Sequence, residues 1–209
     1  MAPVWRLLLG QSFLICIEVH LNERLICRAG VADACILNCI VGAGVGGDQP
    51  ASFHVAGMLD LPEDRAAHVY WSDESALAPP DHLRIALVDS DEPSPPLRVT
   101  PTDSPEYLEE QRQFAELEKS TTSPPVPGPK RWPNATLSLR VNNSDETRAT
   151  LKNQEEHILC STVWDKWRPE FLRVYVRSFS SGWSKNEAKT EWLRANLRVG
   201  EYLDIGVEA

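Results

Sequence analysis

The sequence predicts an α+β fold, in which a small mixed sheet with two or three helices is interrupted by a proline-rich, acidic and partly disordered segment. Three observations support this prediction. The chain has 209 residues, 42% of them hydrophobic, which is enough for one core. Residues 48–133 hold 16 acidic against seven basic side chains, and 12 of the 16 prolines lie between 79 and 133. After residue 134, strand-like and helix-like patterns alternate.

These shifts in composition predict three parts. Residues 1–88 form an apolar N-terminal segment that contains a glycine-rich turn. Residues 89–133 form an acidic, proline-rich linker with one amphipathic helix, because dense proline and charge leave little apolar surface to offset the entropy of ordering. Residues 134–209 form a C-terminal α+β unit that carries four of the seven tryptophans, and a fifth, Trp132, lies just before it.

The N-terminus carries an apolar run from Leu7 to Ile17 behind Arg6. Polar residues interrupt this run and Glu18 follows it, so we expect no membrane span. The run fits a buried element of a cytoplasmic protein, and it also fits the apolar part of a secretory signal peptide within residues 1–30. In the secreted alternative, four cysteines remain that could pair, and two glycosylation sequons, at Asn134 and Asn142, gain meaning. These cysteines are Cys27, Cys35, Cys39 and Cys160.

Two short apolar runs predict strands in the N-terminal part. The run Ala34 to Val41 has the length and apolar character of a buried strand. The run Leu83 to Val88 lies between a Pro-Pro pair and an acidic cluster, which favours a strand with defined ends.

A glycine-rich motif follows the first of these runs. Gly42, Gly44 and Gly47 have the spacing GxGxxG, and this segment resembles the opening of flavin- or nicotinamide-binding Rossmann domains. The resemblance implies FAD or NAD(P) as a cofactor, with Asp60 or Glu63 at the ribose. It covers about 30 residues, and Pro50 stands where the following helix should already run. The alternative interpretation is a glycine-rich turn after a buried strand.

The linker carries a clear helix signal. Ser104 has the character of an N-cap and Pro105 that of a first helical residue. An apolar stripe follows, which an isolated helix of about 15 residues would have to dock on this chain or on a partner. We therefore predict these stripe residues as partner-binding: Tyr107, Leu108, Phe114 and Leu117.

Two further linker patterns concern proline. A PxxP stretch with Pro124 and Pro127 fits a polyproline II ligand, or alternatively a stiff spacer. Four Ser/Thr-Pro pairs predict modification by proline-directed kinases. The predicted sites are Ser94, Thr100, Ser104 and Ser123.

The C-terminal part alternates between strand and helix patterns. Strands are predicted over Ala135–Val141 and Phe171–Phe179 from their period of two. Helices are predicted from Gln154 to Trp167, and after a capping box of Ser184 and Glu187 as far as Leu197. A terminal strand is expected within residues 199–207.

These patterns favour a non-enzymatic interaction or regulatory protein. No nucleophile elbow, P-loop or HExxH motif occurs, and the cysteine and histidine spacings do not match the usual zinc ligand sets, so we predict neither catalytic nor metal-binding residues. The acidic balance disfavours nucleic acid as a partner, and another protein is expected instead. The alternative is a reduced, Rossmann-like oxidoreductase-related protein that uses the Gly42–Gly47 loop.

Overall fold

A computed structural model describes residues 14–44, 50–120, 132, 134–151, 155–180 and 190–208; for Phe114 and residues 117–120 it describes the backbone only. The N-terminal elements are β1 (Leu14–Leu21), β2 (Arg24–Ala29), β3 (Ala34–Gly44), β4 (Ala51–Leu61), β5 (Arg65–Leu77), β6 (His82–Ser90), β7 (Arg98–Pro101) and α1 (Pro105–Ser120). The C-terminal elements are β8 (Thr136–Val141), β9 (Thr147–Thr150), β10 (His157–Asp165), β11 (Leu172–Phe179), β12 (Thr190–Leu197) and β13 (Tyr202–Glu208).

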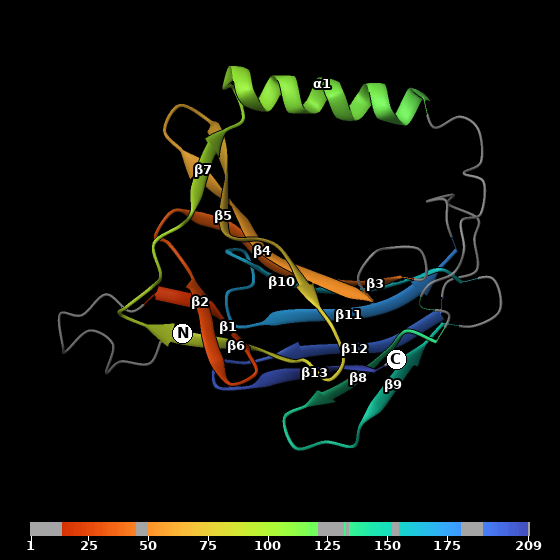
Figure 1. The fold of residues 1–209 in the computed structure, drawn as a ribbon. Coiled ribbons are helices and arrows are strands. Elements are labelled where there is room, and N and C mark those ends of the chain that lie inside the picture. The colour runs from red at the N-terminus through yellow and green to blue at the C-terminus, as the bar shows by residue number, and fades with distance from the viewer. Residues whose placement is uncertain are drawn as a thin grey trace, which may run out of the picture.

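The strands form a two-layer β-sandwich (Figure 1). One sheet has the strand order β2-β1-β6-β13-β8-β9, and the other has the order β12-β11-β10-β3-β4-β5-β7. All strand pairs in the described residues are antiparallel. The sheets are stacked so that β2 packs near β5, β1 near β3, and β9 near β12. Strand β7 therefore lies beyond the edge of the six-stranded sheet.

The core lies between the two sheets and joins early and late parts of the chain. Its buried side chains alternate with outward ones along each strand, as expected when one face of a sheet is covered. Strand β3 pairs with β10, and β6 pairs with β13, so both sheets combine strands from before residue 89 and after residue 134. All five cysteines are free thiols buried in this sandwich.

The predicted fold class was wrong, because the described residues hold 13 strands and one helix instead of a mixed sheet with two or three helices. Two predicted helices account for much of the error. Residues 157–165, placed in a helix from Gln154 to Trp167, form strand β10 at the centre of a sheet. Residues 190–197, placed in the helix that ends at Leu197, form strand β12. Ser184 and Glu187 lie outside the described residues.

The reason for the error in β10 is that both faces of this strand carry apolar side chains. Ile158 and Cys160 point into the core, while Leu159 and Val163 point outward from a strand flanked on both sides. A strand of this kind loses its period of two and cannot be told from a buried helix by pattern alone.

Other elements were predicted from the sequence and are confirmed. The strand patterns at 34–41, 83–88, 135–141, 171–179 and 199–207 correspond to β3, β6, β8, β11 and β13. Helix α1 begins at Pro105 as the N-cap signal predicted.

The described part of the acidic segment, residues 89–120, contributes ordered structure to the sandwich, in contrast to the partly disordered linker expected there. Residues 90–97 cross the side of the sandwich between β2 and β5. The Ser94 amide donates to the Arg28 carbonyl (2.9 Å), the Ser94 Oγ accepts from the Arg28 amide (2.9 Å), and the Trp71 indole donates to the Ser94 carbonyl (3.0 Å). These contacts occupy polar groups of edge strand β2 and continue into β7, which pairs with β5.

Candidate functional site

Helix α1 starts at a capped end next to strand β7. The Ser104 Oγ accepts a hydrogen bond from the Tyr107 amide at 3.2 Å, which satisfies one of the free donors of the first turn. Pro105 occupies the first helical position, where its missing N–H costs nothing. The local sequence thus fixes where the helix begins.

Few contacts hold α1 to the sandwich. The Tyr107 ring stacks on His68 of β5 with 5.2 Å between centroids, and Glu110 pairs with Arg98 of β7 at 3.6 Å. The Arg98 guanidinium also lies 4.4 Å from the centroid of the Tyr70 ring. The helix projects from the body of the molecule along one side of the seven-stranded sheet (Figure 1).

Large apolar side chains are exposed on α1 and along β7, which is the edge strand to which α1 is anchored. Leu108 of α1 is 57% exposed, Leu97 is 65% exposed and Val99 of β7 is 46% exposed. Val99 lies opposite the buried Val69, so it points toward the inner side of the sandwich, but the six-stranded sheet ends before reaching β7. We call these three side chains, with Arg98 and Tyr107, the α1–β7 corner.

The predicted partner-binding residues fall partly in this corner. The structure places Tyr107 at the anchor of α1 and Leu108 in solvent. Phe114 and Leu117 lie on the helix, but their side chains are outside the described residues, as are Pro124 and Pro127 altogether. The sequence did not point to Leu97 and Val99, because their exposure depends on the offset between the two sheets.

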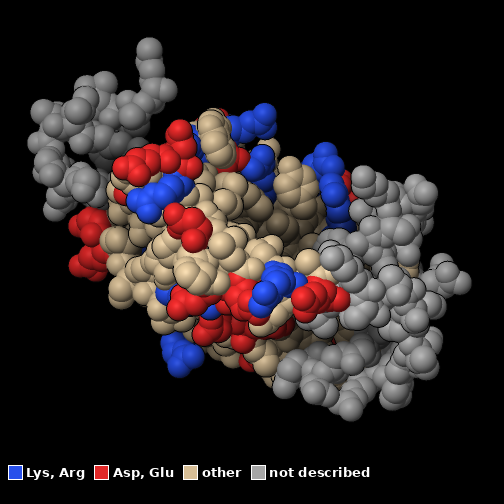
Figure 2. Space-filling model, turned by 90° about the horizontal axis from the view of Figure 1, so that it is seen from above, with Lys and Arg blue, Asp and Glu red and all other residues tan. Residues whose placement is uncertain are grey.

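The outer face of the seven-stranded sheet is apolar along its central strands β10, β3 and β4. Half-buried side chains point outward there: Ile36, Ile40, Met58, Leu159 and Val163. Seen from above, a stretch without charged side chains separates groups of Lys, Arg, Asp and Glu (Figure 2). The Asn38 Oδ1 is buried within this face and has no hydrogen-bond partner among the residues that the structure describes.

The glycine motif does not form a dinucleotide-binding turn. Gly42 and Gly44 lie inside strand β3, and strand β4 returns antiparallel to it, pairing Ser52 with Gly42. A Rossmann fingerprint requires a helix and a parallel strand after the first strand, and the fold supplies neither between residues 50 and 61. Gly47 lies outside the described residues.

Glu63, the predicted ribose ligand, lies far from the glycines. It follows β4 at the end opposite to Ser52, eleven residues farther along the chain. At about 3.4 Å per residue this separation exceeds roughly 30 Å. The structure therefore does not bring Glu63 together with Gly42 and Gly44.

The predicted modification sites have different environments. Ser94 is half-buried and bonded to Arg28, whereas Thr100 is only 7% exposed on β7. Ser104 caps α1, and Ser123 lies outside the described residues.

A polar hollow of about 210 Å³ lies on the outer face of the six-stranded sheet. Gly206 of β13 pairs with His82 of β6 on one side and with Ser138 of β8 on the other, so the three residues form one row across the sheet. A Cβ at position 206 would overlap the Ser138 hydroxyl. The Ser138 hydroxyl therefore fills the space where a side chain at position 206 would begin, and both residues line the hollow. We call it the Gly206 hollow.

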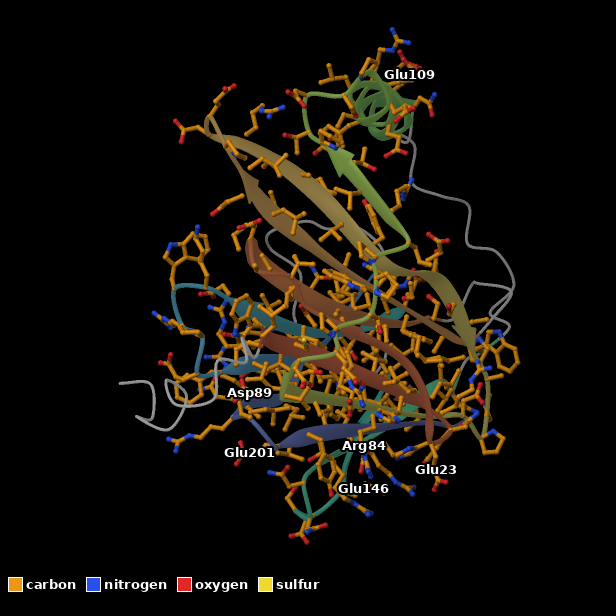
Figure 3. All side chains as sticks on the ribbon, turned by 90° about the vertical axis from the view of Figure 1, so that its left-hand side faces the viewer. Glu23, Arg84, Asp89, Glu109, Glu146 and Glu201 are labelled. Carbon is orange, nitrogen blue, oxygen red and sulfur yellow. The ribbon has the colours of Figure 1, made fainter. Side chains whose placement is uncertain are left out.

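Charged side chains border the Gly206 hollow. The Arg84 guanidinium donates to both oxygens of Asp204, at 2.7 and 3.1 Å, and these bonds raise the pKa of Arg84 above its ordinary value. Arg140 pairs with Glu146 at 3.4 Å on the other side. Arg84 and Glu146 lie on the side of the molecule opposite to Glu109 of α1 (Figure 3).

The Gly206 hollow contains Ser, His and Asp side chains, but they do not form a catalytic triad. The His82 Nε2 is 3.9 Å from Asp204 Oδ1, and this carboxylate is already bound by Arg84. No hydrogen bond joins Ser138 to His82 in the structure, so the link between nucleophile and base that defines a triad is not made. Sequence reasoning missed this site, because its residues are far apart in the chain and only strand pairing unites them.

Within the described ranges, no three His, Cys, Asp or Glu side chains are arranged to hold a metal ion. No helix within these ranges has the length and apolar character needed to cross a membrane. Comparison of the chain with protein-family models, with curated proteins and with solved structures finds no match.

Proposed function

We propose that this protein is a non-enzymatic binding protein that engages a protein partner through α1 and the α1–β7 corner. The observation that carries the proposal is the exposure of Leu108, Leu97 and Val99 on adjoining elements. Large apolar side chains that stay exposed on neighbouring elements, here on α1 and on the edge strand β7, are typical of protein interaction sites.

The charge of α1 indicates the kind of partner. The helix carries five glutamates against one arginine and one lysine. A partner surface with apolar side chains flanked by Lys or Arg complements this composition, and opposite charges favour fast and selective association. The contacts of the described side chains also support the proposal, because α1 is held mainly through Tyr107 and Glu110 and leaves Leu108 exposed.

The outer face of the seven-stranded sheet adjoins α1 and gives the partner further apolar area.

The test places a photo-crosslinking residue at position 108, in the organism that makes the protein, and identifies the adduct. The purified partner is then titrated with the wild type, with Leu108→Glu and with the control Leu25→Glu, whose side chain is 39% exposed on β2. We expect Leu108→Glu to weaken binding at least tenfold, Leu25→Glu to leave it unchanged, and added salt to weaken it. Equal affinity of Leu108→Glu and wild type would overturn the proposal.

A further inference from the structure

We propose that the Gly206 hollow binds a neutral polyhydroxylated ligand, namely a single saccharide ring. The site lies on the side of the molecule opposite to α1, so the proposal is independent of the protein-partner interface (Figure 3).

The first argument is the shape of the hollow. Strand β13 lies between β6 and β8, and its outward row holds only the small side chain of Ser138 next to Gly206, which leaves the hollow open toward His82, Asp204 and Arg140. Its volume of about 210 Å³ corresponds to roughly seven water molecules at ~30 Å³ each. This space suits one small ring better than an oligomeric chain or a large cofactor.

The second argument is the mixture of hydrogen-bonding groups. Asp204 and Glu146 offer carboxylate oxygens that only accept, whereas Arg140 offers only donors. Ser138 and His82 can each donate and accept. A sugar hydroxyl both donates and accepts one or more hydrogen bonds, so a ring with several hydroxyls matches such a lining.

The third argument is the balance of charge. Asp204 is neutralised by Arg84, and Glu146 accepts from both Arg140 and Arg148. An anion entering the hollow would meet two carboxylates, and a cation would meet the arginines. A neutral polar ligand avoids both repulsions.

The fourth argument is that one carboxylate of the lining, Asp204, is held in place before any ligand arrives. The Asp204 side chain is 13% exposed, and both of its carboxylate oxygens accept hydrogen bonds from Arg84. It lies on β13, in the middle of the six-stranded sheet. Groups fixed in this way lose little freedom on binding. For a ligand of about a dozen heavy atoms we expect a dissociation constant on the order of 1 mM.

The test is an NMR titration of the full chain, labelled with ¹⁵N, with methyl α-D-glucopyranoside, methyl α-D-galactopyranoside and methyl α-D-mannopyranoside, each to about 50 mM, well above the expected dissociation constant. Inorganic phosphate serves as the anionic probe. We expect at least one glycoside to shift the amides of Ser138, Arg140, Asp204 and Gly206. Shifts there with phosphate alone, or with none of the glycosides, would overturn the proposal.

Substitutions then decide whether binding occurs in the hollow. Gly206→Ala should weaken glycoside binding at least tenfold by filling it, whereas the matched control Gly42→Ala should not, because a Cβ at position 42 meets open space. If Gly206→Ala fails to fold, Ser138→Ala removes a hydroxyl from the lining without adding an atom and should also weaken glycoside binding. A folded variant that still binds the glycoside as the wild type does would contradict the assignment.

Discussion

Burial changes the acid–base chemistry of the cysteine side chains. Cys16, Cys27 and Cys160 are at most 2% exposed, and loss of hydration raises the pKa of these thiols to about 11, 12 and 12. The charged thiolate is disfavoured in the core, so each folded thiol keeps its proton at a pH where the unfolded chain loses it. Since the raised pKa belongs to the folded state, the stabilisation is complete below about pH 9 and is lost as the pH rises toward 11–12.

This linkage predicts that Cys160→Ala changes how stability depends on pH. The variant should be less stable than wild type at pH 8, because it leaves a cavity. Between about pH 9 and 10.5 the difference should shrink by roughly 2 kcal/mol, since each thiol contributes about 1.4 kcal/mol per pH unit. Urea unfolding of the wild type and of the variant at pH 8, 9 and 10.5 measures the free energies of unfolding.

The control is Val176→Ala, whose site lies opposite Cys160 on β11 and has no titratable group. The difference in unfolding free energy between this variant and the wild type should therefore stay constant with pH. If the unfolding free energies of Cys160→Ala and wild type differed by the same amount at every pH, the result would contradict this explanation.

Single residues also show which parts of the sites were accessible to sequence reasoning. Ser104 was predicted as an N-cap because capping depends on neighbours within one turn of helix. The Gly206 hollow was not predicted, because His82 and Ser138 lie 56 residues apart in the sequence and are brought together only by strand β13 between them. Local chemistry is visible in a sequence, whereas the pairing of distant strands is not.

At the scale of elements, α1 is attached so lightly that its stability is separable from that of the sandwich. We predict that Ser104→Ala speeds amide hydrogen exchange within α1 about fivefold, since loss of an N-cap costs about 1 kcal/mol. The midpoint of global unfolding should barely change, because α1 shares few contacts with the rest. Hydrogen exchange by mass spectrometry and urea unfolding measure the two effects.

A matched variant separates capping from the loss of any polar group at this position. Ser104→Asp keeps an N-cap acceptor and adds negative charge near the positive end of the helix. We expect exchange in α1 to be as slow as in the wild type, or slower. A fall in global stability for Ser104→Ala as large as its effect on α1 would instead show that the helix is an integral part of the fold.

The elements also differ in how well their patterns revealed them. Strands β8 and β11 alternate between apolar inward and polar outward residues, so a period of two identified them. Strand β10 is apolar on both faces, and β12 pairs with β11 through a register shift at Val176 and Arg177 that interrupts the alternation. Central position and irregular pairing, which no local pattern encodes, thus produced the two false helices.

At the scale of the whole molecule, the pairing of early with late strands predicts a single cooperative unfolding transition. A fragment of residues 134–209 lacks β3 and β6, on which β10 and β13 pair, and should not reach its native structure alone. Mixed with a fragment of residues 1–133, it should regain the far-ultraviolet circular dichroism of the intact chain. A native-like spectrum of the C-terminal fragment by itself would refute the prediction.

The order of the strands in the six-stranded sheet has a consequence for synthesis in the cell. Strand β6 is made well before β13, and residues such as Arg84 and Asp204, which pair across them, are 120 positions apart. At 5–20 residues per second, β6 waits for about 6–24 s with one edge unpaired. During that time the nascent chain presents an open edge that other chains can join, so the protein is expected to depend on chaperones until residue 208 has left the ribosome.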